Sequence, residues 1–169
     1  SRIAQMIGRP CLTGHLGEWL ASRLFDIELC GSATQAGFDG RFRSGPLMGK
    51  SVNVKWYLKQ ANVIDLTEKV ENRPDFYLVM TGPRSREPNS KLSSRPWAVD
   101  FAYLYEARSL HEDLEGRGLF IGVGSSIRTE LWGPAQVYPP TPDSPLEVPS
   151  EQEESLKMFH SSKIAGDSS

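Results

Sequence analysis

The chain has few cysteines and histidines and no long apolar run, and these absences exclude several classes of protein. Two cysteines and three histidines among 169 residues are too few for a disulfide framework or a structural zinc site of the usual kind. No stretch approaches the roughly 18 consecutive apolar residues of a membrane-spanning helix. The first ten residues also lack the apolar segment of a secretory signal. We therefore expect a cytoplasmic protein that does not enter a membrane. Whether a leader ahead of Ser1 has been removed is left open.

The chain also lacks a strong charge of either sign, since 19 Lys and Arg oppose 21 Asp and Glu. Residues 1–138 carry 17 bases and 15 acids, whereas residues 139–169 hold two bases and six acids. The second segment is rich in Pro, Ser and Glu, a composition that buries too little apolar surface to offset the entropy of ordering. The length fits one domain. We expect a folded domain over residues 1–138 and a disordered acidic tail over residues 139–169, in which only a short helix after Ser150 is plausible.

Hydrophobic periodicity predicts an α/β (α+β) domain with a mixed sheet. Leu16, Trp19, Leu20 and Leu24 recur on one helical face and predict a helix over 13–25. Period-two alternation predicts strands over 27–29 and 51–57. An unbroken apolar run at 76–81 is typical of a strand buried on both faces. Further elements are expected as a strand over 97–105, a helix over 106–115, and short closing strands at 119–124 and 135–138.

Three polar residues are expected to converge at one end of this sheet. Asn53 and Lys55 lie two apart on the strand 51–57 and therefore share a face, and Asp39 lies on the preceding strand of a hairpin. Burying such groups is costly unless they are paired, and that cost often marks a functional site. The alternative interpretation is a plain Asp39 to Lys55 ion pair on a solvated face.

The same residues resemble a known family. Gly17-Glu18 on the first helix, the segment QAGFDG at 35–40 and the segment VNVKW at 52–56 resemble the motifs of the PD-(D/E)xK nuclease superfamily, which has the restriction-endonuclease-like fold. The motifs span about residues 13–57, and the order of elements is similar over 13–125. In that family a helix bearing a Glu precedes a mixed sheet, an Asp ends one strand, and an acid-x-Lys triplet lies on its neighbour.

The resemblance implies a Mg²⁺-dependent DNA endonuclease, with Mn²⁺ as an alternative ion. It assigns Asp39 as the central metal ligand, Lys55 as the catalytic lysine and Asn53 as the occupant of the acidic position. Glu18 becomes an auxiliary metal-binding carboxylate, and Gln35 a contact to phosphate or water. The departure from the family pattern is Asn53, because an amide oxygen ligates Mg²⁺ without contributing negative charge. Either Glu18 replaces the missing carboxylate, or the domain is catalytically degenerate and binds nucleic acid or a protein partner without turnover.

DNA is the expected partner, and a homodimer is left open. The loop 82–96 and its surroundings offer bases suited to phosphate contacts, namely Arg84, Arg86, Lys91, Arg95 and Lys59. A solvated surface loop explains the same composition. His111 is expected on a surface helix and receives no role.

Overall fold

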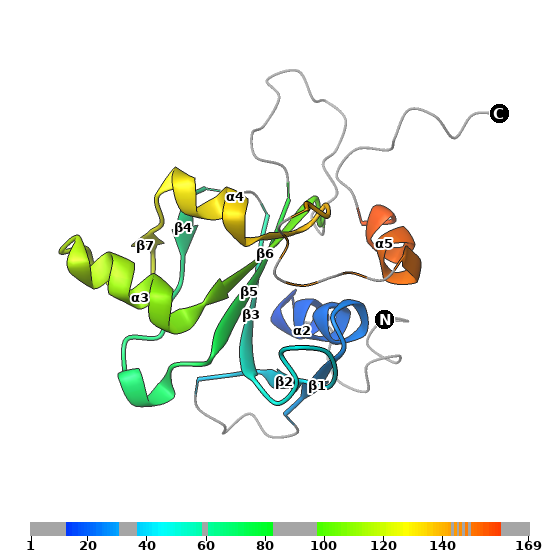
Figure 1. The fold of residues 1–169 in the computed structure, drawn as a ribbon, viewed down its shortest axis with the longest axis horizontal. Coiled ribbons are helices and arrows are strands. Elements are labelled where there is room, and N and C mark those ends of the chain that lie inside the picture. The colour runs from blue at the N-terminus through cyan, green and yellow to red at the C-terminus, as the bar shows by residue number, and fades with distance from the viewer. Residues whose placement is uncertain are drawn as a thin grey trace, which may run out of the picture.

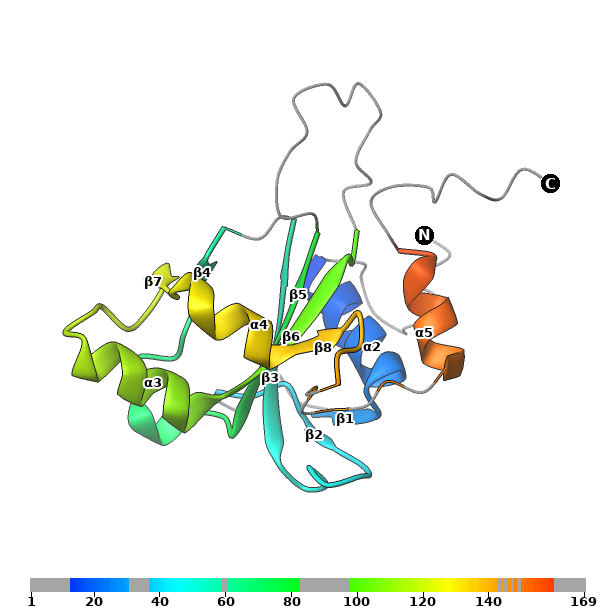
Figure 2. The ribbon, with the colours of Figure 1, turned by 45° about the horizontal axis from the view of Figure 1, so that its top comes forward.

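The computed structural model describes residues 13–30, 37–58, 61–82, 98–142, 144, 146, 148 and 150–159. These residues form a six-stranded sheet with helices on both faces (Figures 1 and 2). In the strand order β1-β2-β3-β5-β6-β8, β3 and β5 run parallel and the other neighbours antiparallel, so the expected α/β domain with a mixed central sheet is confirmed. The bounds are β1 Ile27–Leu29, β2 Gly40–Phe42, β3 Ser51–Tyr57, β5 Phe76–Thr81, β6 Phe101–Glu106 and β8 Gln136–Tyr138.

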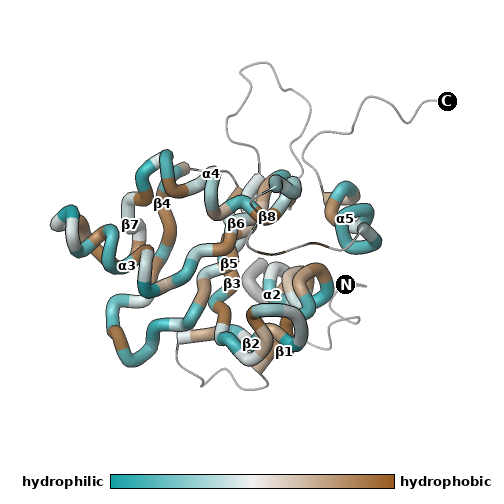
Figure 3. The backbone as a smooth tube through the Cα atoms, in the orientation of Figure 1, coloured by the Kyte–Doolittle hydropathy of each residue, from teal (hydrophilic) through white to brown (hydrophobic). Residues whose placement is uncertain are grey.

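The central strands fill a core on each face of this sheet. Val52 and Leu78 belong to a core shared with helices α2 (Thr13–Leu24) and α5 (Ser150–Lys157), and we call this side the α2 face. Tyr77 and Val79 belong to a core shared with α3 (Ala107–Gly116) and α4 (Trp132–Ala135), on the α3 face. Because strand side chains alternate, β5 is buried on both faces. This burial explains why β5 has an unbroken apolar sequence. The strand is labelled in the middle of the hydropathy-coloured trace (Figure 3).

The first helix forms where the periodicity predicts it, with Leu20 and Leu24 buried on the α2 face. Gly17 marks the point where α2 crosses β3, because a Cβ there would lie 3.1 Å from the Trp56 ring. Trp56 therefore packs toward α2. Residues 43–50 connect β2 to β3 as the expected hairpin.

The connection from β3 to β5 contains β4 (Val63–Ile64) and the 3-10 helix η1 (Val70–Asn72). β4 pairs with β7 (Ser125–Ser126) in a separate two-stranded sheet, and a second 3-10 helix, η2 (Thr129–Leu131), precedes α4. The expected strand at 119–124 is wrong. Gly122 and Gly124 adopt φ angles of +156° and +80°, which turn the chain instead of extending it.

The described part of the segment after Tyr138 packs against the domain. This differs from the disordered tail that the composition predicts for residues 139–169. Leu156 of α5 is fully buried, and Val148 is buried beside it in the core of the α2 face. The Val99 N–H donates to the Phe159 carbonyl at 2.6 Å. A single apolar side chain on an otherwise polar helix thus anchors α5, and composition averages conceal such an anchor.

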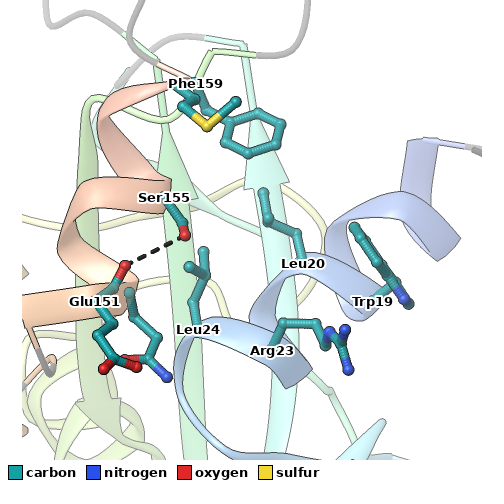
Figure 4. A pocket seen from close by; sticks show the side chains of 9 residues that line it. Trp19, Leu20, Arg23, Leu24, Glu151, Ser155 and Phe159 are labelled. Carbon is teal, nitrogen blue, oxygen red and sulfur yellow. Dashed lines mark hydrogen bonds between the residues drawn. The ribbon is translucent and has the colours of Figure 1, made fainter.

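A pocket of about 400 Å³ is lined by residues of α2, of α5 and of the two positions after α5 (Figure 4). Its walls are mainly apolar, and the Arg23 guanidinium stacks over the Trp19 ring at its rim. The pocket lies on the α2 face, away from the polar residues of β3. Among the described residues, no helix is both long enough and apolar enough to cross a membrane.

Candidate functional site

Asp39 lies where β2 begins and stands beside Asn53 of β3. Gly40 pairs with Val52 in the ladder, and the Asp39 N–H donates to the Val52 carbonyl at 2.9 Å. The Asp39 carboxylate then bends along β3, where its Oδ2 accepts the Val54 N–H at 2.6 Å. This side chain takes over a hydrogen bond that β2 no longer supplies, so the carboxylate is fixed at the point where the two strands separate.

The Asn53 amide is held on one side only. Its Nδ2 donates to the Gly37 carbonyl at 3.4 Å, whereas its Oδ1 is buried and accepts no hydrogen bond in the described part of the chain. Asn53 is paired with Tyr77 in the parallel register of β3 and β5, so its side chain belongs to the α3 face. Asp39 and Asn53 are therefore adjacent, as the sequence predicts.

Two glycines are required for this arrangement. Gly37 has a φ of +95°, and a Cβ there would overlap the Asn72 carbonyl of η1. Gly40 is equally restricted, because a Cβ would overlap the Glu28 carbonyl of β1. The segment that carries Asp39 is consequently packed closely against its neighbours on both sides of Asp39. A side chain larger than hydrogen does not fit at position 37 or at position 40.

Lys55 follows Asn53 on the same face and is half-buried. Its ammonium makes no ion pair or hydrogen bond with any described residue, since the Asp39 carboxylate is directed to the Val54 N–H instead. The alternative interpretation of an Asp39 to Lys55 ion pair is therefore not what the structure shows. Lys55 is therefore a half-buried lysine, two residues from Asn53 on β3, that has no carboxylate partner among the described residues.

Sequence reasoning missed a neighbouring contact made by Tyr57, the next residue on this face. Its hydroxyl accepts the Asp65 N–H at 2.8 Å, and the Asp65 carboxylate accepts the Gly124 N–H at 2.8 Å. Burial raises the pKa of Tyr57 to about 12. The phenol stays protonated near neutral pH and is not a general base. No local pattern reveals this contact, because it depends on how β4 folds back over β3.

The remaining candidate residues are placed less directly. Glu18 is half-buried on α2, next to the contact between Gly17 and Trp56. That helix covers the face of the sheet opposite Asn53 and Lys55, so Glu18 belongs to the other face of β3. Outside the described residues lie the candidates Gln35, Lys59, Arg84, Arg86, Lys91 and Arg95.

His111 is a buried residue, which corrects the expectation of a surface position. Only 2% of it is exposed, its Nε2 lies 2.9 Å from the Tyr77 hydroxyl, and the two rings stack. The Tyr77 hydroxyl also accepts the Thr67 N–H at 3.2 Å. Burial, followed by the charge of Arg73, lowers the pKa of His111. The neutral imidazole therefore lies on the α3 face against Tyr77, the residue paired with Asn53 in the register of β3 and β5.

No group of three or more His, Cys, Asp or Glu side chains gathers within the described ranges. The oxygen donors at this site are instead one carboxylate and one amide, from Asp39 and Asn53. In comparisons with known proteins, neither a family model nor a curated protein matches this chain.

Proposed function

We propose that the protein is a Mg²⁺-dependent endonuclease that hydrolyses phosphodiester bonds of DNA. Its active site would consist of Asp39, Asn53 and Lys55. The observation that carries the proposal is the buried Asn53 Oδ1, which has no hydrogen-bond partner in the described part of the chain, next to the fixed carboxylate of Asp39. A buried acceptor without a partner costs about 1–3 kcal/mol. A ligand that binds the Asn53 Oδ1 would offset that cost.

The donor set fits a hard divalent cation. Asp39 uses Oδ2 for the Val54 N–H, which leaves Oδ1 for a ligand, and Asn53 Oδ1 supplies a second oxygen. Mg²⁺ prefers such oxygen ligands and keeps several waters, and Mn²⁺ accepts the same set. When bound, the ion would polarise the scissile phosphate and acidify a water molecule. Asp39 and Asn53 would hold it, and Glu18 is the candidate for a further carboxylate around the β3 edge.

Lys55 supplies the positive charge that hydrolysis of a phosphodiester requires. Its ammonium is not neutralised by any described acid, so it can orient the attacking water or stabilise the charge that develops on the phosphate. Its place on β3, a strand paired on one side with β5, fixes the stem of the side chain. We assign it the role of the catalytic lysine.

The restriction-endonuclease-like fold is part of this proposal. Its support is the succession of α2, the antiparallel β1-β2-β3 meander and the parallel neighbour β5. Asp39 precedes β2 and the Asn-x-Lys triplet lies on β3, in the order that the family motif has. The connection between β3 and β5 contains β4 and η1 in this chain.

A second candidate function rests on Asn53. With one carboxylate and one neutral amide, the site attracts a divalent cation less strongly than a pair of acids does. The degenerate alternative is a domain of the same fold that binds nucleic acid or a protein partner without turnover. It predicts binding that does not depend on the metal.

A cleavage assay separates the two. Plasmid and single-stranded DNA are incubated with the parent protein in Mg²⁺, Mn²⁺ or chelator, and Asp39→Asn is the matched variant, since an amide oxygen still accepts the Val54 N–H. We expect cleavage by the parent in either metal, none in chelator, and a strong loss in Asp39→Asn with an unchanged melting temperature. Binding without metal-dependent cleavage would favour the degenerate alternative.

A further inference from the structure

Arg73 is a half-buried arginine without a counterion in the described chain. It follows η1 directly, and its guanidinium makes no hydrogen bond or ion pair with any described residue. Arginines that are partly withdrawn from water usually pair with a carboxylate or phosphate, because five N–H donors otherwise lose their hydration. Arg73 therefore has donors to offer to a ligand.

The acids nearest to Arg73 in the chain do not neutralise it. Asp75 Oδ2 accepts the Ser51 N–H at 2.9 Å and the Ser51 hydroxyl at 3.1 Å, which joins the starts of β3 and β5. Glu71 is exposed on η1. The Arg73 charge is nevertheless felt on the α3 face, where it disfavours protonation of His111. The Arg73 guanidinium is therefore close enough to His111 to affect its pKa, alongside burial and the opposing charge of Glu115.

A chain of contacts joins Arg73 to the candidate site. The carbonyl of Asn72, its preceding residue, lies directly against Gly37, and the Gly37 carbonyl accepts the Asn53 amide. Asp39 is two residues beyond Gly37. Arg73 is thus linked to the Asp39–Asn53 pair through the Asn72–Gly37 contact, and Lys55 lies two residues from Asn53 on β3. Both are half-buried, and neither is paired with a described residue.

We propose that Arg73 binds a phosphate of the nucleic-acid backbone next to the one that Lys55 contacts. This inference rests on the proposed function and specifies its substrate subsite. The planar guanidinium matches two phosphate oxygens at once, and a polyanion with regularly spaced phosphates is the ligand that two separate cations would recognise. A carboxylate of a protein partner would satisfy Arg73 alone and leave Lys55 unpaired.

Salt-dependent binding tests the subsite. Fluorescence anisotropy with labelled single-stranded and duplex oligonucleotides is measured over a range of salt concentrations in chelator and in Mg²⁺. Each phosphate contact contributes about 0.7–0.9 to the slope of log K against log salt. We expect Arg73→Ala to lower the slope by about that amount and to weaken binding about tenfold at low salt. Arg73→Lys should keep the salt dependence but bind oligonucleotides more weakly. It keeps the positive charge but loses the planar guanidinium that contacts two phosphate oxygens at once.

The matched control is Arg108→Ala, which removes an arginine that is 76% exposed and paired with Glu112 on α3. It should leave both slope and affinity unchanged. An unchanged slope in Arg73→Ala, or an equal drop in Arg108→Ala, would overturn the subsite. If Arg73→Ala melts at a much lower temperature, the comparison of parent, Arg73→Lys and Arg73→Gln at low temperature takes its place.

The outcomes also separate this inference from the proposed function. Parent protein that binds oligonucleotides with an Arg73-dependent slope but cleaves nothing in Mg²⁺ or Mn²⁺ supports the subsite and removes hydrolysis. Metal-dependent cleavage with a normal KM in Arg73→Ala supports hydrolysis and removes the subsite. Parent protein that binds no oligonucleotide removes both.

Discussion

The Asp39 carboxylate accepts the backbone N–H of Val54 at 2.6 Å, and this contact decides how the candidate site is built. The hydrogen bond draws the carboxylate along β3, away from a pairing with Lys55. The neighbouring Asn53 Oδ1 is buried and accepts no hydrogen bond from the described residues. The Asp39 carboxylate and the Lys55 ammonium therefore do not neutralise each other. The proposed hydrolysis of phosphodiester bonds would need a metal ligand and a cation on one face of the sheet.

Replacing Lys55 by Ala should remove metal-dependent cleavage while leaving the fold intact. Loss of a positioned transition-state charge costs about 10² to 10³ in rate. The ammonium makes no polar contact with a described residue, so thermal unfolding should change little. Lys50→Ala, at an exposed position just before β3, is the control and should keep full activity. Equal rates in Lys55→Ala and the parent would remove Lys55 from the mechanism.

Replacing Asn53 by Asp should increase Mg²⁺ affinity, since it adds a carboxylate beside Asp39. Repulsion between the two acids should lower the melting temperature of the metal-free variant, and Mg²⁺ should restore it because the ion binds the folded state. Calorimetric titration and melting curves measure both effects. Asn62→Asp is the control, because Asn62 is exposed and its φ of 54° is one that Asp tolerates. Equal Mg²⁺ responses in the two variants would place residue 53 away from the metal.

Local periodicity predicts much of this fold. The helix at Thr13–Leu24 and the strand at Ser51–Tyr57 have apolar spacings that only one backbone conformation can bury on one face. The adjacency of Asp39 and Asn53 follows from a short hairpin. These features depend on residues that are close in the chain.

Contacts between distant segments could not be predicted in the same way. The close contact between Gly37 and Asn72 depends on the path of the chain between β3 and β5. The sequence of that connection has no clear hydrophobic periodicity. The burial of Leu156 depends on a single apolar side chain in a polar stretch, and the burial of His111 on the register that sets Tyr77 beside it. Such contacts are decided by packing, and composition does not record them.

Replacing Gly37 by Ala should destabilise the fold and disrupt the site. The added Cβ overlaps the Asn72 carbonyl at a φ of +95°. Gly45→Ala is the control, because Gly45 also has a positive φ, of +75°, but no heavy atom lies within 4 Å of the added Cβ. The control should lose about 1–2 kcal/mol in denaturant unfolding from backbone strain alone, and Gly37→Ala clearly more. Similar losses in both would mean that the Asn72 contact is dispensable.

Replacing Leu156 by Ala should destabilise the domain by about 2–5 kcal/mol, the usual cost of truncating a fully buried leucine. Met158→Ala, two residues later and 72% exposed, should cost less than about 0.5 kcal/mol. Urea unfolding of both variants measures the difference. Near-equal stabilities would show that α5 contributes nothing to the core of the α2 face.

The buried His111 should make stability depend on pH. In the folded protein it faces the hydroxyl of Tyr77 and the charges of Arg73 and Glu115, and burial and Arg73 together lower its pKa. Below about pH 6.5 the unfolded chain binds a proton that the folded chain refuses, so unfolding becomes easier as pH falls. The stabilisation is complete above that pH and is lost between it and the lower folded pKa, with a slope of at most about 1.4 kcal/mol per pH unit from this one group.

Urea unfolding of the parent and of His111→Gln, which cannot titrate in this range, tests the dependence. The variant should have a lower stability near neutral pH, because the Tyr77 contact is altered, but a flatter decline on acidification. Arg73→Ala should move the histidine pKa upward, measured by NMR titration of the imidazole, and thereby narrow the pH window of the decline. Parallel stability curves for parent and His111→Gln would contradict the assignment, because the acid sensitivity would then come from carboxylates elsewhere.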